Sequence, residues 1–194
     1  MIKLPKFTTQ SMYDSETDFN LQMNTERISK LLIHYEIFKK IIKVKGDIVE
    51  CGIFKGTSFV RLGVLRELFK KKCKLIGFDV FADEYPNTNF INEQKHRDHW
   101  VKTAGHSSIS EKQLKTVFNK KNIGNFKLIK GDVLKTIPEF VKKNKKTKIS
   151  FLNIDLAFVE PTECALEYLY DKVSKGGVVV FDNYGGTGKD GTFY

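Results

Sequence analysis

The chain has 194 residues, enough for one domain with a sizeable core, and its 41% apolar and 29% charged residues are ordinary for a soluble globular protein. No run of 18 apolar residues and no apolar signal-peptide core are present, so we expect a cytoplasmic protein with no membrane partner. Three cysteines without paired spacing, Cys51, Cys73 and Cys164, exclude a disulfide or zinc framework.

The net charge of +10 first raises the question of nucleic-acid binding. The excess is mostly lysine and is spread over expected helix ends, such as 70–72 and 142–148. No aromatic residue interleaves with the second run, as a base-stacking platform would require. We therefore interpret these lysines as solvated surface, and nucleic acid is the less favoured partner.

Hydrophobic patterning predicts strands and helices that alternate along the chain after an irregular N-terminal arm, 1–24. Ser110 with Gln113, and Thr136 with Glu139, have the spacing of capping boxes that begin helices. In chain order, the expected elements are a helix at 25–44, a strand at 47–50, a helix at 59–72, a strand at 74–81, a long loop at 82–110, a helix at 110–122, a strand at 126–132, a helix at 136–143, a strand at 148–155, a helix at 160–174 and a strand at 177–182.

Five alternations of strand and helix predict an α/β fold with a doubly wound parallel sheet. Ligands of such sheets bind beyond the carboxyl ends of the strands. A single acid at a strand end is commonly a helix cap or a solvated group. Here all five expected strands end in one, which indicates a site at that edge: Glu50, Asp79, Asp132, Asp155 and Asp182.

Three nucleotide-site templates compete for the glycine turn after the first strand, GDIVECGIFKGTS at 46–58. A phosphate-binding P-loop is excluded because Thr57 stands where its lysine should be. The dinucleotide fingerprint is excluded because Phe54 occupies its second glycine position. The remaining pattern, acid-x-Gly-x-x-x-Gly, resembles motif I of class I S-adenosylmethionine methyltransferases. A tight strand–helix turn without a ligand is the alternative.

Several segments together resemble the macrocin O-methyltransferase family, a class I branch that methylates sugar hydroxyls of natural products. The resemblance runs from about residue 25 to residue 185 and implies a Rossmann-like methyltransferase domain at 25–194. The matching segments are GDIVECGIFKGTS, IGFDVF, SISEKQL, KGDVLKTIPEF and IDLAFVEPTECALEYLYDKVSKGGVVVFDNYG.

The resemblance implies a site for S-adenosyl-L-methionine at the carboxyl edge of the sheet. Gly52 and Gly56 would pass close to its methionine part, Asp79 would bind the ribose hydroxyls, and Asp132 would lie near the adenine. Asp79 and Asp132 could instead be strand-end caps. The expected cofactor-binding residues are Glu50, Gly52, Gly56, Ser58, Asp79 and Asp132.

Three oxygen-bearing side chains, Asp155, Asp182 and Asn183, would form a site suited to Mg²⁺ at neighbouring strand ends. The ion would lower the pKa of an acceptor hydroxyl and orient it for methyl transfer. Asp182 and Asn183 could instead form an ordinary turn. Two neutral residues depart from the family pattern: Ala157 stands where a second acid is common, and Asn183 where an aspartate is usual.

The segment 82–110 corresponds to the part of the family that covers the acceptor as a lid. It holds three candidate bases, His96, His99 and His106, and we expect one of them or Asp155 to act in catalysis. His34, in the first expected helix, is predicted to be structural.

The end of the chain departs from the class I pattern, because the last expected strand is not followed by the usual two-strand hairpin. The chain is then either a fragment or a naturally shortened member of the class. The missing hairpin would expose a sheet edge, which a second subunit of a homo-oligomer could cover. The sequence thus predicts an O-methyltransferase acting on a hydroxyl of a sugar, glycan or glycosylated small molecule. The alternatives are an inactive cofactor-binding subunit and, less favoured, a nucleic-acid methyltransferase.

Overall fold

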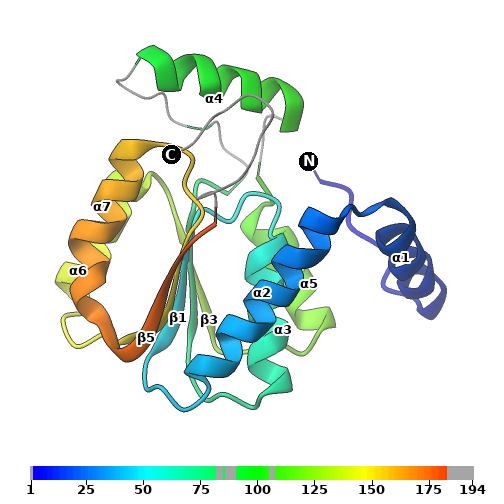
Figure 1. Cartoon of the computed structure of the whole chain (residues 1–194), viewed down its shortest axis with the longest axis horizontal. Helices are drawn as coiled ribbons and strands as arrows, with labels where there is room; N and C mark the ends of the chain where they lie inside the picture. Colours follow the sequence, from blue (N-terminus) through cyan, green and yellow to red (C-terminus); the bar gives the residue numbers. More distant parts are fainter. Residues whose placement is uncertain (1, 82–84, 86–90, 105–107, 183–194) are drawn as a thin grey trace.

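In the computed structural model of the chain, residues 2–81, 85, 91–104 and 108–182 are described. Five parallel strands form one sheet in the order β3-β2-β1-β4-β5, with helices on both of its faces (Figure 1). This arrangement confirms the predicted doubly wound parallel sheet. The strands are β1 (Asp47–Cys51), β2 (Leu75–Asp79), β3 (Phe126–Lys130), β4 (Ile149–Ile154) and β5 (Val173–Phe181).

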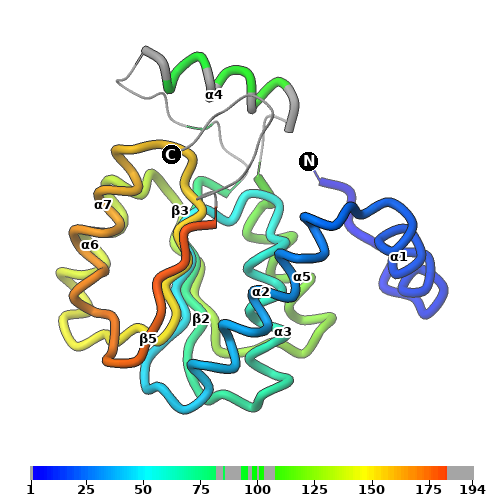
Figure 2. The backbone as a smooth tube through the Cα atoms, in the orientation of Figure 1, coloured from blue at the N-terminus to red at the C-terminus, as the bar shows by residue number. Residues whose placement is uncertain are grey.

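Helices α2 (Thr25–Ile41), α3 (Thr57–Leu68) and α5 (Glu111–Lys120) cover one face of the sheet, while α6 (Val133–Lys143) and α7 (Val159–Leu169) cover the other (Figure 2). Because side chains alternate along a strand, β1 and β4 supply both cores. Ile48 and Phe151 pack on the first face, and Val49 and Leu152 on the second. The run of apolar residues in these strands is therefore explained by burial on both sides.

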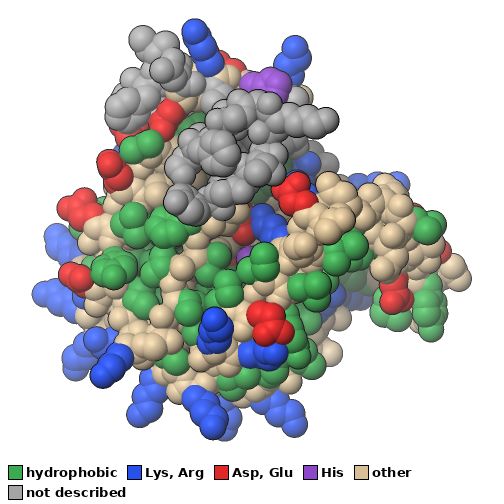
Figure 3. Space-filling view, in the orientation of Figure 1, with side chains coloured by type: hydrophobic (Ala, Val, Ile, Leu, Met, Phe, Trp, Pro, Cys, Tyr) green, Lys and Arg blue, Asp and Glu red, His purple; other side chains and the backbone are tan. Residues whose placement is uncertain are grey.

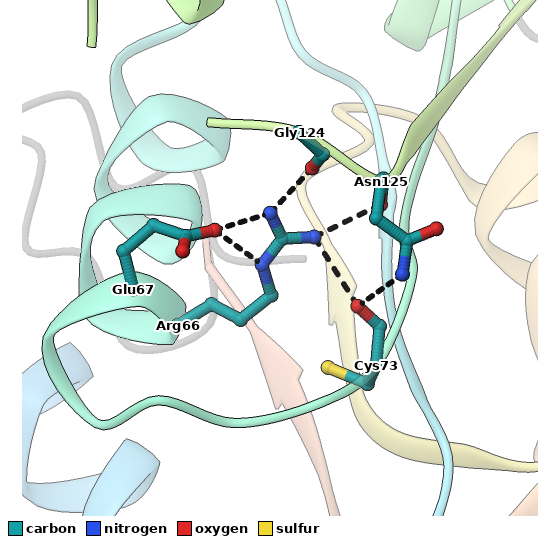
Figure 4. Close-up of polar contacts among 5 residues, drawn as sticks. All are labelled: Arg66, Glu67, Cys73, Gly124 and Asn125. Carbon is teal, nitrogen blue, oxygen red and sulfur yellow. Dashed lines mark hydrogen bonds and ion pairs between the residues drawn. The ribbon is translucent and has the colours of Figure 1, made fainter. Parts of the chain in front are cut away.

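A buried arginine, Arg66, connects segments at the amino-terminal edge of the sheet through hydrogen bonds (Figure 4). Arg66, 3% exposed, comes from the end of α3 and donates hydrogen bonds to the carbonyls of Cys73, Gly124 and Asn125, as well as to the Glu67 carboxylate. Its guanidinium thereby joins the segments that lead into β2 and β3. Figure 3 shows lysines and arginines around this lower rim of the molecule, as expected for solvated faces.

Two segments predicted to be irregular contain helices. Helix α1 (Thr9–Gln22) lies in the expected arm and begins with a capping box between Thr8 and Ser11. None of its residues is buried, so it has no apolar face that periodicity could reveal. Helix α4 (Ile91–Ala104) lies in the expected loop and is placed beyond the carboxyl ends of the strands (Figure 1).

Helix starts and ends account for most other differences. The capping box of Ser110 and Gln113 is confirmed. The box predicted for Thr136 and Glu139 is wrong, because α6 already begins at Val133 with Asp132 as its cap.

The sequence also placed the end of α7 too late. After Leu169 the chain forms a short 3₁₀ helix, η1 (Tyr170–Lys172), and enters β5 at once. β5 is the last strand on its side of the sheet as described. Among the described residues, no helix has the length and apolar character needed to cross a membrane.

Candidate active site

Polar side chains interrupt the face of the sheet that α2, α3 and α5 cover, near the carboxyl ends of its central strands. The register pairs Glu50 of β1 with Asn153 of β4, both fully buried. One layer further on, Asp155 and Asp182 follow β4 and β5 and share a hydrogen bond. The structure thus brings together three of the predicted strand-end acids, Glu50, Asp155 and Asp182.

Glu50 lies in an environment that disfavours its charge. Burial raises its pKa well above the usual range; the hydrogen bond from the Ser58 hydroxyl offsets this only in part, and the nearby Asp155 and Asp182 raise it further. Ser58, predicted as a cofactor ligand, therefore donates its hydrogen bond to Glu50, while Gly56 caps α3 without a side-chain bond.

The second oxygen of Glu50 and both polar atoms of the Asn153 amide have no hydrogen-bond partner among the described residues. Buried polar groups are normally paired, so a bound water molecule or ligand group would be needed to pair these atoms. Asn153 is not among the predicted site residues. Its signal in the sequence is an amide side chain in the otherwise apolar second half of the strand ISFLNI.

The glycine turn is held in place by Asp79 at the end of β2. One carboxylate oxygen accepts hydrogen bonds from the backbone N–H groups of Ile53 (2.7 Å) and Phe54 (2.9 Å), and the other accepts one from Phe81 (2.9 Å). A carboxylate can accept about four hydrogen bonds. Asp79 therefore anchors the turn and keeps capacity for a ribose hydroxyl, and that second role stays a prediction.

Gly52 has a left-handed backbone (φ +87°) and lies against the end of β4. A Cβ atom there would stand 2.8 Å from the carbonyl carbon of Asp155 and closer still to its oxygen. Gly56 shares the conformation (φ +86°) but has room, since its nearest neighbours, Ile109 and Leu114, would lie 3.5 Å from a Cβ. Gly52 thus allows a close approach of backbones, whereas Gly56 serves the turn itself.

Asp182 is surrounded by cationic and N–H groups from the N-terminal part of the chain. Lys30 forms an ion pair with one oxygen, and His34 Nε2 lies 3.4 Å from the other. His34 Nδ1 lies 3.2 Å from the Arg61 guanidinium. Burial alone would raise the pKa of Asp182, but the hydrogen bonds with His34 and Asp155 and the charge of Lys30 hold it well below its usual range. His34, predicted to be structural, therefore contacts the site.

Asp132 caps α6 through a hydrogen bond from the Leu134 N–H to its Oδ1 (3.0 Å). This is the strand-end cap considered as the alternative to adenine binding. A place near the adenine stays a prediction for this residue.

Comparison with known proteins decides the family. Residues 23–190 match the family model described as Macrocin-O-methyltransferase (TylF). The chain belongs to the macrocin O-methyltransferase family. The match covers the glycine turn, all five strands and the carboxylates at their ends. No curated protein sequence matches the chain.

Solved structures of methyltransferases share the fold of this macrocin O-methyltransferase family member. The calicheamicin methyltransferase CalS11 superposes with a TM-score of 0.62 at 19% identity, over 89% of this chain and 70% of that one. Its apo form, described as a TDP-rhamnose 3'-O-methyltransferase, gives 0.59 at 21%, over 90% and 69%. The O-methyltransferase NovP gives 0.69 at 22%, over 81% and 65%.

The predicted magnesium site of this family member is not matched by its side chains as the structure describes them. Both oxygens of Asp182 are engaged, one by the Lys30 ammonium and one by His34. Asn183, the third predicted ligand, lies outside the described residues. Within the described ranges, no three His, Cys, Asp or Glu side chains are grouped to hold a metal ion. We therefore assign no reaction step to Mg²⁺.

Helix α4 is positioned over the carboxyl edge, where the resemblance implied a lid over the acceptor (Figure 1). Glu93 of α4 accepts a hydrogen bond from the Val159 N–H at the start of α7 (2.9 Å), which ties the two helices together. Of the three candidate bases, His99 is exposed on α4, while the side chain of His96 and the whole of His106 lie outside the described part of the chain. A catalytic role for a histidine stays a prediction.

Proposed function

We propose that the chain is an S-adenosylmethionine-dependent O-methyltransferase that acts on a hydroxyl of a sugar or a glycosylated small molecule. The observation that carries this proposal is the glycine turn at the carboxyl end of β1, fixed by two backbone hydrogen bonds to Asp79, in a chain of the macrocin O-methyltransferase family. A sugar acceptor is supported by the similarity to CalS11, described as acting on TDP-rhamnose.

The turn offers the groups that a methionine sulfonium ligand needs. The N-terminus of α3 carries backbone N–H groups for a carboxylate, and Gly52 and Gly56 bring the backbone close to the ligand. Glu50 and Ser58 lie beneath the turn as a bonded pair, and Asp79 retains capacity for a ribose hydroxyl. When bound, the cofactor supplies an electrophilic methyl group on a positively charged sulfur.

Methyl transfer requires that the acceptor hydroxyl lose its proton as its oxygen attacks the methyl carbon. With the cofactor bound, a C–O bond would form as the C–S bond breaks, and the sulfur would leave as a neutral thioether. We propose Asp155 as the base, because it directly follows β4 and its backbone lies against Gly52 of the glycine turn; it would act in its ionised form, without the proton that it shares with Asp182. The histidines of the segment 82–110 are the alternative bases. Most of the acceleration would come from holding the hydroxyl in line with the methyl group.

The test is calorimetric titration with S-adenosylhomocysteine, followed by mass spectrometry of sugar nucleotides incubated with S-adenosylmethionine. Asp79→Asn should weaken binding at least about tenfold, because the amide cannot accept all the bonds that the carboxylate accepts. Thermal unfolding of the variant serves as the control for folding. No binding by the wild type would overturn the cofactor assignment. Binding without transfer to any sugar would instead support the inactive, cofactor-binding alternative.

A further inference from the structure

The surroundings of Asp182 are built from helices that cover the sheet. Lys30 and His34 are four residues apart on α2, so they lie on the same side of that helix, toward β5. Arg61 of α3 stands behind His34, and its charge interacts with that of Asp182. The Asp182 side chain is only 2% exposed, so these groups, with Asp155, replace most of its hydration.

The position of α2 is fixed by packing and does not depend on the ion pair alone. Phe38 and Ile41, further along the same helix, are fully buried in the core. The His34 ring, 1% exposed, meets Phe151 of β4 edge-on at 6.4 Å. The packing of α2 against β4 and β5 therefore holds Lys30 next to Asp182.

A divalent cation needs deprotonated oxygens with free lone pairs and an excess of negative charge around it. At Asp182 one oxygen meets an ammonium group and the other faces an imidazole. The residue two positions after Asp155 is Ala157, and the residue after Asp182 is Asn183, so neither adds negative charge. Ligand geometry and charge thus both oppose the entry of a second cation.

We infer that the Lys30 ammonium takes the place of a divalent cation at Asp182, neutralising and orienting this carboxylate and excluding Mg²⁺ and Mn²⁺ from the site. Lys30 and His34 are then positioning residues, which act on the reaction through Asp182. The inference depends on the contacts of Asp182 and not on the proposed acceptor or on methyl transfer, so its test needs no activity.

The experiment is a titration of the full chain with Mn²⁺, followed by electron paramagnetic resonance of the free ion, with S-adenosylhomocysteine absent and then present. The wild type should show no stoichiometric binding below about millimolar Mn²⁺. Lys30→Met, which keeps most of the side-chain volume and removes the charge, should bind at least about tenfold more tightly. The matched control is Lys39→Met, since Lys39 is exposed on the same helix and contacts only near neighbours on it among the described residues, the Glu36 carboxylate and the Tyr35 ring.

Thermal unfolding gives a second measurement, the change of Tm with Mn²⁺. A purely structural role of Lys30 would not make the Tm of its variant depend on Mn²⁺. Mn²⁺ should raise the Tm of Lys30→Met and leave the wild type and Lys39→Met unchanged, because only the first has an uncompensated Asp182. Adding Asp182→Asn to Lys30→Met should abolish the gain. Micromolar stoichiometric binding by the wild type overturns the inference, and this result can be obtained even if Lys30→Met fails to fold. Equal affinities of Lys30→Met and Lys39→Met would likewise overturn it.

Discussion

Replacing Gly52 with alanine should destabilise the protein far more than the same change at two other glycines. Two separate costs add at this position. A non-glycine residue in the left-handed region costs about 1–3 kcal/mol, and φ here is +87°. A Cβ atom pressed against the Asp155 carbonyl adds an overpacking cost of about 1–3 kcal/mol, because the atom that must move is backbone at the end of β4.

The chain offers a graded series in which these costs can be separated. Gly56→Ala keeps the strained conformation (φ +86°) but meets side chains only at 3.5 Å, so about 1–3 kcal/mol is expected. Gly124→Ala has nothing within 4 Å of the new atom and should change stability by less than about 0.5 kcal/mol. Gly52→Ala should therefore lose about 2–6 kcal/mol of unfolding free energy.

Urea unfolding followed by circular dichroism measures these differences, and a thermal scan should show about 2–4 °C for each kcal/mol. The order of stability should be Gly124→Ala, then Gly56→Ala, then Gly52→Ala. If Gly52→Ala is no less stable than Gly56→Ala, the close approach of the turn to β4 contributes nothing, and our reading of Gly52 is refuted.

Three further outcomes are expected. Glu50→Gln should raise the Tm at pH 8 and barely change it at pH 4. Burial raises the pKa of Glu50 in the folded protein, whereas the unfolded chain ionises near the usual pKa of a glutamate. Wild-type stability therefore falls as the pH rises from the unfolded pKa toward the folded one, and the neutral glutamine avoids this loss. Asp132→Ala should lose about 1 kcal/mol with the loss of its cap. A parallel loss of S-adenosylhomocysteine affinity, measured by calorimetry, would instead support the adenine role. Cys51 and Cys164, whose pKa values are raised by burial, should react with iodoacetamide at pH 8 far more slowly in the native than in the unfolded protein, as mass spectrometry would show.

The sequence predicted the sheet because its signal is local. The central strands β1, β2 and β4 are short, mostly apolar segments with an acid at or just after their ends, and burial on both faces favours such segments. Helix α1 gave no such signal, because none of its residues is buried, and α4 lies in a polar segment without a clear pattern. The start of α6 was misplaced because Asp132 and Thr136 are both good caps, and tertiary packing of Val133 favoured the earlier one.

The candidate site was predicted as a set of strand-end acids but not as a set of contacts. Strand alternation is enough to place Glu50, Asp155 and Asp182 at one edge. It says nothing about what faces them from a covering helix. In the sequence, Lys30 and His34 look like ordinary helix residues, because their partner, Asp182, is far from them along the chain. Their role follows from how α2 packs, which no local pattern encodes.

The pairing of α2 with the end of β5 also bears on the order in which the protein folds. Lys30 and Asp182 are about 150 residues apart, so their contact closes nearly the whole described chain. During synthesis α2 emerges early, and β5 is the last of the described strands to follow. Until β5 is in place, Lys30 and His34 lack Asp182, the carboxylate that both contact in the folded chain. The charge arrangement around Asp182 therefore requires α2 and β5 to be in their native positions together, so a probe of this contact would report long-range tertiary structure and not local helix formation.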